Sequence, residues 1–141
     1  MKADLNNKLI AVIRVRGRIG VRRTIKETLN RLNVKKVNNL ALIFGTKSNL
    51  GMIEKCKDYV TYGAIKEEVL VKLLDKRGLK AGKEEVGAML AGKKIAREII
   101  KIPIPMHPPR RGYEGIKRPF NTGGALGYRG EEINELIGRM S

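Results

Sequence analysis

The sequence has very little of the residues that build aromatic cores, disulfides and metal sites. Among its 141 residues there is no tryptophan, aromatic residues make up 4%, and cysteine and histidine occur once each. Hydrophobic residues make up 42%, so the chain can form a core, but that core must consist of aliphatic side chains. The single cysteine, Cys56, excludes an intramolecular disulfide and fits a reducing cytoplasm.

Long hydrophobic runs are absent as well. No apolar stretch approaches the roughly 20 residues that a membrane-spanning helix needs. The apolar run nearest the N-terminus, Leu9–Ile13, is too short for the hydrophobic region of a signal peptide. We therefore expect a cytoplasmic location and no membrane partner.

Residues for catalysis are equally scarce. His107 lies between Met106 and two prolines, where a loop residue or a group that stacks on RNA is a better interpretation than a general base. Cys56 lies late in a short amphipathic helix, which is typical of a small, half-buried apolar residue. One cysteine and one histidine give no metal-ligand spacing. We expect no enzymatic activity, cofactor, metal or small-molecule substrate.

Positive charge is what the sequence has in excess. Lysine and arginine number 30 against 14 aspartates and glutamates, which gives a formal net charge of +16 and a pI near 10.3. A compact domain with this excess repels itself unless a polyanion neutralises it. Nucleic acid is the commonest such partner and an anionic membrane the second, so the composition favours a nucleic-acid-binding protein.

The N-terminal part of the chain alternates between predicted strands and helices. Apolar, β-branched runs bounded by glycine predict strands, and apolar residues at helical spacing predict helices. Ser48 and Asn49 are the expected N-cap of the second helix. Whether the first two strands are parallel, with a right-handed crossover, stays open at this point. The expected order is strand 9–16, helix 21–32, strand 40–44, helix 50–56 and strand 58–62.

The rest of the chain has a different character. A proline-rich segment, 103–109, can be neither helix nor central strand. Residues 110–130 have no apolar period and should be extended, and a final amphipathic helix is expected over 133–140. Further helices are expected over 67–74, 83–90 and 93–100. We therefore divide the chain into an αβ core (1–63), a helical extension (64–100) and a basic tail (101–141).

Arginine gathers where the first strand meets the first helix. Gly17-Arg18-Ile19-Gly20 lacks the third glycine of a dinucleotide fingerprint and the lysine of a P-loop, and in KH domains the same spacing joins two helices. Backbone N–H groups at a helix N-terminus nevertheless attract phosphate, and the alternative is a solvated surface. The candidate phosphate-binding residues of this corner are Arg14, Arg16, Gly17, Arg18, Gly20, Arg22, Arg23 and Lys26.

A second group of cations lies in the tail, interleaved with glycines and aromatic rings. Cations neutralise phosphates, rings stack on bases, and glycines let the backbone approach a polyanion closely. The alternative is a disordered basic linker, but the final helix gives the segment a fixed far end. We expect truncation after Pro109 to weaken binding and leave the core folded. The candidate RNA-binding residues are His107, Arg110, Arg111, Tyr113, Lys117, Arg118, Phe120, Tyr128 and Arg129.

Five stretches of the sequence together form a specific pattern. They are LIAVIRVRG at 9–17, followed by a basic helix, LGMIEKCKDYVTYG at 50–63, HPPRRGY at 107–113, GGALGYRG at 123–130 and INELI at 133–137. With these motifs the chain resembles the large-subunit ribosomal protein uL30 family. The first stretch resembles the opening of that family, the second its central signature, and the last three its longer archaeal and eukaryotic type.

The resemblance implies an α+β, ferredoxin-like fold, in which three strands form one antiparallel sheet packed on two helices, with a helical and extended C-terminal extension. It implies a structural constituent of the large ribosomal subunit, bound to rRNA near 5S rRNA and the central protuberance, beside other ribosomal proteins. The family's basic corner maps onto residues 16–20. Its loop before the second helix maps onto 46–51. The family's usual arginine just before the Gly-Met pair is Leu50 here, and Lys47 in this loop or Lys55 after it can supply the charge. A non-ribosomal RNA-binding module or RNA chaperone is the alternative.

Overall fold

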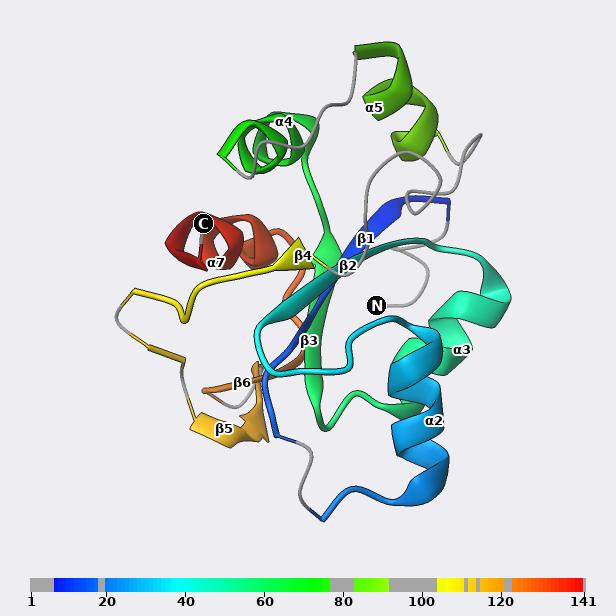
Figure 1. Cartoon of the computed structure of the whole chain (residues 1–141), viewed down its shortest axis with the longest axis vertical. Coiled ribbons are helices and arrows are strands. Elements are labelled where there is room, and N and C mark those ends of the chain that lie inside the picture. The colour runs from blue at the N-terminus through cyan, green and yellow to red at the C-terminus, as the bar shows by residue number, and fades with distance from the viewer. Residues whose placement is uncertain are drawn as a thin grey trace.

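The chain folds around one six-stranded sheet with helices on both faces (Figure 1). The computed structural model describes residues 7–17, 20–76, 83–91, 104–110, 112–113, 115–120 and 123–140. In order across the sheet, the strands are β4 (Ile104–Pro105), β2 (Asn39–Phe44), β1 (Leu9–Arg14), β3 (Val60–Ala64), β6 (Gly124–Tyr128) and β5 (Gly115–Pro119).

Strand β1 lies near the centre of the sheet because its side chains suit burial on both faces. All of its residues are buried, and successive side chains of a strand point to opposite faces. Leu9, Ala11 and Ile13 pack into the core on one face, and Ile10 and Val12 pack into the core on the other. A strand buried on both faces reads as a continuous apolar run, as this one does.

The first three strands are antiparallel, as the family resemblance implied. β1 pairs antiparallel with β2, where Ile13 lies opposite Leu40, and antiparallel with β3, where Ile13 lies opposite Thr61. The parallel alternative for the first two strands is therefore excluded. The α+β class is confirmed, and the end of β1 lies beside the start of β2.

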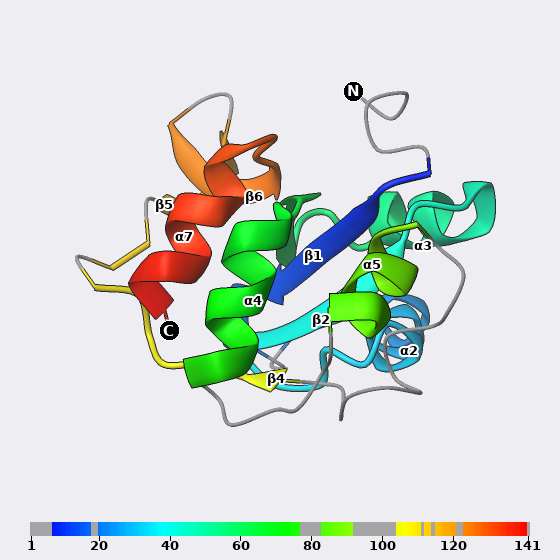
Figure 2. The ribbon, with the colours of Figure 1, turned by 90° about the horizontal axis from the view of Figure 1, so that it is seen from above.

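Helices α2 (Arg23–Arg31) and α3 (Lys47–Lys55) cover one face of the sheet (Figure 2). Helix α3 begins earlier than predicted because its N-cap is Thr46, whose side chain accepts a hydrogen bond from the backbone N–H of Asn49 at 3.2 Å. The prediction of Ser48 and Asn49 as the cap was therefore wrong. Both helices present aliphatic side chains to the same buried cluster.

The opposite face is covered by α4 (Glu67–Lys76), α5 (Lys83–Leu90) and α7 (Glu132–Met140). Figure 2 shows α4 and α7 side by side on this face. The apolar sides of these helices share one buried cluster with β1 and β2. The helices predicted over 83–90 and 133–140 are confirmed, whereas the helix predicted over 93–100 lies outside the described residues.

The segment expected to be extended is largely built into the sheet. Strand β6 pairs in parallel with β3, strand β5 pairs in parallel with β6, and β4 pairs with β2 at the edge of the sheet, where proline is tolerated. Gly63, expected to end the third strand, lies inside β3. A side chain there would meet the carbonyl oxygen of Gly130 and the side chain of Ile133. The division into core, extension and tail stays a prediction.

Candidate RNA-binding surface

The strand-to-helix corner is ordered by contacts with the segment before β3. The N–H groups of Val15 and Arg16 both donate to the carbonyl oxygen of Tyr59, at 2.9 and 3.2 Å. The guanidinium of Arg16 lies 5.1 Å from the centre of the Tyr59 ring, within cation–π range. Gly17 and Gly20 are exposed, and Gly20 has a φ of +77°, which favours glycine. Arg18 lies outside the described residues.

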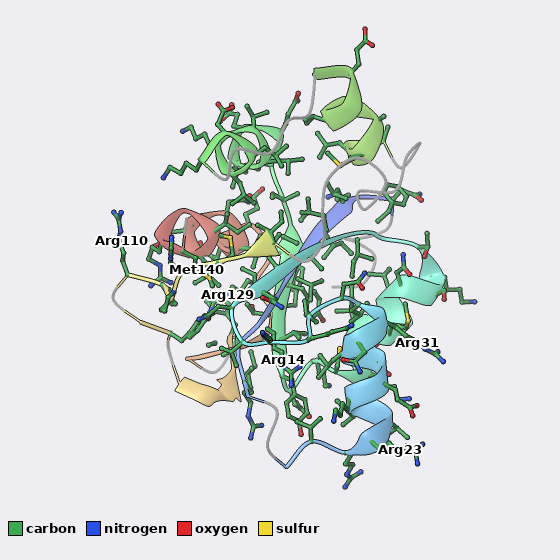
Figure 3. The ribbon with its side chains drawn as sticks, in the orientation of Figure 1. Arg14, Arg23, Arg31, Arg110, Arg129 and Met140 are labelled. Carbon is green, nitrogen blue, oxygen red and sulfur yellow. The ribbon has the colours of Figure 1, made fainter. Side chains whose placement is uncertain are left out.

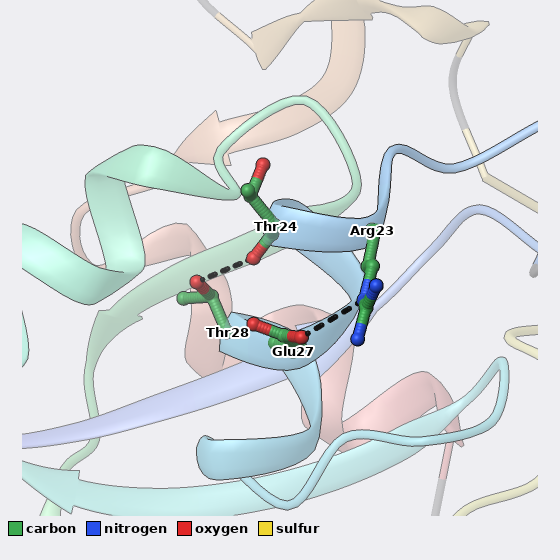
Figure 4. A network of polar contacts seen from close by, with 4 residues as sticks. All are labelled: Arg23, Thr24, Glu27 and Thr28. Carbon is green, nitrogen blue, oxygen red and sulfur yellow. Dashed lines mark hydrogen bonds and ion pairs between the residues drawn. The ribbon is translucent and has the colours of Figure 1, made fainter.

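Helix α2 leaves its first turn open to an anion. Its N-cap residue, Arg22, makes no side-chain capping hydrogen bond, and the first turn holds no acidic residue. The N–H groups at such an end lack intrahelical partners and attract phosphate. Arg22, Arg23 and Lys26 are exposed. Arg23 contacts Glu27 at 3.4 Å, but both side chains are well exposed, so solvent and salt weaken this pair (Figure 4).

Arg14 belongs to the interior of the protein and not to its surface (Figure 3). Its side chain is 1% exposed, and burying a guanidinium is costly unless its donors are satisfied. This corrects the prediction that Arg14 contacts RNA, because backbone oxygens occupy its donors. The acceptors are the carbonyl oxygens of Arg16 at 2.9 Å, Gly17 at 3.2 Å, Val34 at 3.0 Å and Lys35 at 2.9 Å.

Arg129 is a second buried arginine and needs the same correction. It is 5% exposed, and its Nε donates to the hydroxyl of Thr61 at 2.8 Å. A terminal nitrogen donates to the carbonyl oxygen of Ala125 at 3.2 Å, and the guanidinium lies 4.7 Å from the centre of the Phe120 ring. Arg129 therefore joins the end of β6 to β3, and the half-buried Phe120 ring takes part in that packing.

His107 and Arg110 are exposed on a segment that runs along the end of α7. The N–H of His107 donates to the carbonyl oxygen of Met140 and that of Arg110 to the carbonyl oxygen of Arg139, both at 3.1 Å. These bonds satisfy carbonyls that the last turn of a helix leaves unpaired. Figure 3 shows Arg110 on the opposite side of the molecule from Arg23, so the corner and this segment present separate cations.

Tyr113 of the tail lies next to the corner. Tyr113 is half-buried, its ring packs against the cluster that contains Val15, and its hydroxyl donates to Oδ1 of Asn38 at 2.6 Å. Tyr128 is also half-buried, and its ring centre lies 5.9 Å from that of Tyr62. Three further candidates lie wholly or by their side chains outside the described residues: Arg111, Lys117 and Arg118.

Comparison with known proteins decides the family. Residues 10–60 match the family described as Ribosomal protein L30p/L7e. The chain is 44% identical over 150 residues to "Large ribosomal subunit protein uL30" of Methanococcus vannielii, covering 92% of this chain and 97% of the relative. Relatives with the same name are 43% identical in Nanoarchaeum equitans (92% and 96% covered) and 37% in Methanoculleus marisnigri (94% and 99%). The chain belongs to the uL30 family.

The remaining exposed cations of this uL30 family member lie mostly in and next to α2 and α3. Lys47 and Lys55 are exposed at the two ends of α3. The sequence prediction missed several cations on the same side, although the basic composition of residues 34–39 was visible in the sequence. The missed exposed residues are Arg31, Lys35, Lys36 and Lys57.

Exposed carboxylates lie mainly on the opposite layer of the family's fold. Two of them begin α4 and two more belong to the first turn of α7, where the positive end of a helix favours them. These carboxylates repel phosphate, although Lys66, Lys72 and Lys76 are also exposed on this layer. The exposed carboxylates of α4, α7 and the residue before α7 are Glu67, Glu68, Asp75, Glu131, Glu132 and Glu135.

Cys56 is fully buried and not half-buried as predicted. Its Sγ donates to the carbonyl oxygen of Met52 at 3.3 Å, and burial raises the pKa of the thiol to about 12. The thiol is therefore protonated, and not nucleophilic, at neutral pH. Among the residues that the structure describes, no three His, Cys, Asp or Glu side chains group to hold a metal ion. No helix in the same residues is long and apolar enough to cross a membrane.

Proposed function

We propose that this chain is a structural constituent of the large ribosomal subunit that binds folded rRNA and stabilises it by neutralising phosphates. The observation that carries the proposal is the layer of exposed cations around α2 and α3, in a chain whose relatives are named large ribosomal subunit proteins. The role is structural and not catalytic, and membership of the ribosome places the chain in the cytoplasm.

The distribution of charge supports an approach of RNA from the α2 and α3 side. Lysine and arginine that neutralise phosphates release counterions from the nucleic acid, which favours binding. Arg22 and Lys26 lie at the open first turn of α2. Arg16 lies in the corner before this helix, and its stacking on Tyr59 reduces the entropy it loses on binding. Carboxylates on the α4 and α7 side disfavour the opposite orientation.

We also propose that the tail clamps a second stretch of rRNA. His107 and Arg110 are exposed, and Arg110 lies on the opposite side of the molecule from Arg23 (Figure 3). A subunit position near 5S rRNA and the central protuberance, with ribosomal proteins as neighbours, follows from the family resemblance and belongs to the same proposal.

The test neutralises the corner and compares it with an equal change elsewhere. Arg16→Gln, Arg22→Gln and Lys26→Gln are combined in one variant, and Lys66→Gln, Lys72→Gln and Lys76→Gln form the matched control next to and within α4. Affinity for large-subunit rRNA fragments is measured across salt concentrations. The corner variant should lose roughly 2 to 2.7 units of the slope of log K against log salt, and the control should keep the wild-type slope.

Equal slopes for the two variants would refute the corner as the binding surface. Association with the subunit is tested separately by sedimentation through a sucrose gradient in high salt. A structural constituent should remain with the large subunit, whereas a free RNA-binding module or chaperone should be washed off.

A further inference from the structure

The loop of residues 34–38, between α2 and β2, is held by hydrogen bonds from β1 and from the tail. From β1, Arg14 donates to the carbonyl oxygens of Val34 and Lys35, and the N–H of Asn38 donates to the carbonyl oxygen of Arg14 at 2.8 Å. From the tail, the hydroxyl of Tyr113 donates to the side-chain Oδ1 of Asn38 at 2.6 Å, and the N–H of Met106 donates to the backbone carbonyl oxygen of Asn38 at 3.1 Å. The backbone of this loop is therefore fixed in the folded protein.

The same arginine joins this loop to the strand-to-helix corner. Two donors of Arg14 bond to the carbonyl oxygens of Arg16 and Gly17, and others bond to the loop. The antiparallel pairing of β1 and β2 brings the two segments together, because the end of β1 lies beside the start of β2. Figure 3 shows Arg14 next to the loop that leads from α2 to β2. The corner and the loop are thus two parts of one surface.

The exposed groups of the loop suit a polyanion. Lys35 and Lys36 are exposed and adjacent in sequence, and like charges this close repel each other unless a polyanion neutralises them. The carbonyl oxygens of Val34 and Lys35 turn inward to Arg14, which removes two negative dipole ends from the outer surface. Val37 is 39% exposed, one of two large hydrophobic side chains exposed in the described part of the chain. An exposed aliphatic group beside two cations can cover a ribose while the cations contact phosphates.

We infer that Lys35 and Lys36 bind RNA phosphates as a site continuous with the corner, and that Arg14 is the positioning residue that holds the two parts together. The alternative is a solvated basic turn without a binding role. It does not account for a buried guanidinium that bonds to both segments. The inference rests on the proposed rRNA-binding function and adds a contact element and a positioning residue to it.

The first experiment compares Lys35→Gln/Lys36→Gln with Lys72→Gln/Lys76→Gln, which removes the same charge from α4. Both variants are checked for wild-type melting by circular dichroism. The loop variant should bind rRNA fragments with a salt slope less steep by roughly 1.4 to 1.8 units, which at 0.1 M salt corresponds to roughly 25-fold to 60-fold weaker binding. The α4 variant should keep the wild-type slope.

The outcomes separate the inference from the function on which it rests. If the wild type binds and the loop variant keeps the slope of the α4 variant, the loop site is overturned and the proposed function stands. If the wild-type chain itself shows no salt-dependent affinity for rRNA, the proposed function fails and the loop site fails with it.

The second experiment tests whether Arg14 acts through the loop. Arg14→Lys keeps the positive charge but loses the guanidinium N–H groups that bond to both the corner and the 34–38 loop. In this background the loss of Lys35 and Lys36 should weaken binding several-fold less than in the wild type, because the lysines are no longer held in place. Additive losses are the result expected of an arginine that only stabilises the fold, and they would overturn the positioning role.

A milder variant covers the case in which Arg14→Lys does not fold. Tyr113→Phe removes only the hydroxyl that bonds to Asn38 and holds the loop from the other side. It should reduce the effect of removing Lys35 and Lys36 in the same direction, by a smaller factor. Full additivity in this background would overturn the idea that a fixed loop is needed for binding.

Discussion

Deleting residues 110–141 is expected to unfold the protein. The sequence pattern alone predicts that residues 1–63 survive as a folded core after this truncation. The contacts indicate the opposite, because the deleted part supplies β5, β6 and α7. Without them β3 loses β6, one of its two neighbours in the sheet, and the core cluster on one face of β1 loses α7, one of the three helices that cover it.

The buried side chains of α7 give the size of the effect. Four of them are at most 1% exposed, and fully burying one aliphatic side chain contributes about 1.5–3 kcal/mol. Together they contribute roughly 6–12 kcal/mol, which equals most of the roughly 5–15 kcal/mol by which domains of this size are stable. An extended-chain reference makes this an upper estimate. The four residues are Ile133, Leu136, Ile137 and Met140.

Urea titration followed by far-ultraviolet circular dichroism measures the outcome at constant salt. The full chain should unfold in one cooperative transition, and the truncated chain should show none. Leu136→Ala in the full chain should lower the free energy of unfolding by about 2–5 kcal/mol. Glu135→Ala, one position away and exposed, should change it by less than about 0.5 kcal/mol. A truncated chain with a cooperative transition near the wild-type midpoint would refute the reasoning.

Two further predictions concern single positions. Gly63→Ala should lower the free energy of unfolding by about 1–3 kcal/mol, because the new methyl group would lie 2.9 Å from Cγ2 of Ile133. Gly51→Ala, with open space around it in α3, should raise the free energy of unfolding by about 0.5–1 kcal/mol. Urea midpoints of the two variants check this, and equal midpoints would contradict it. Cys56 ionises near its usual pKa of 9.0 in the unfolded chain but only near about 12 in the folded protein, so the free energy of unfolding should fall between these pH values. Cys56→Ala should flatten this part of the profile of unfolding free energy against pH. An unchanged profile would show that the buried thiol does not cause the fall.

Local pattern was sufficient for the elements whose burial is decided by their own residues. The apolar run of β1 and the apolar side of α7 predict their burial directly, because each faces a core with a regular period. Strand β6 has no such period. Its place depends on pairing with β3, whose Thr61 hydroxyl donates to the carbonyl oxygen of Gly127, a residue 66 positions away. Nothing in either segment alone specifies that pairing.

The buried arginines show the same limit for the candidate site. Arg14 is the last residue of an apolar strand, and in sequence it differs little from Arg16, Arg22 and Arg23, which are not buried. Its burial depends on the carbonyl oxygens of Val34 and Lys35, 20 and 21 positions away, which the fold brings to its guanidinium. Composition therefore locates the basic corner, but only the tertiary structure separates the arginines that contact solvent from those that bond to the backbone.

The net charge of +16 consequently overstates the charge that one RNA surface can meet. Arg14 and Arg129 direct their donors inward, and Arg23 shares its charge with Glu27. The cations that remain exposed lie mostly on the α2 and α3 side, whereas six exposed carboxylates belong to the α4 and α7 side. Because counterion release counts only cations that reach phosphates, the salt dependence of binding should follow mainly the exposed cations of the α2 and α3 layer, with a smaller contribution from the tail. Of the two buried arginines, only Arg14 bonds to the backbone of the corner and of the 34–38 loop, whereas Arg129 joins β6 to β3.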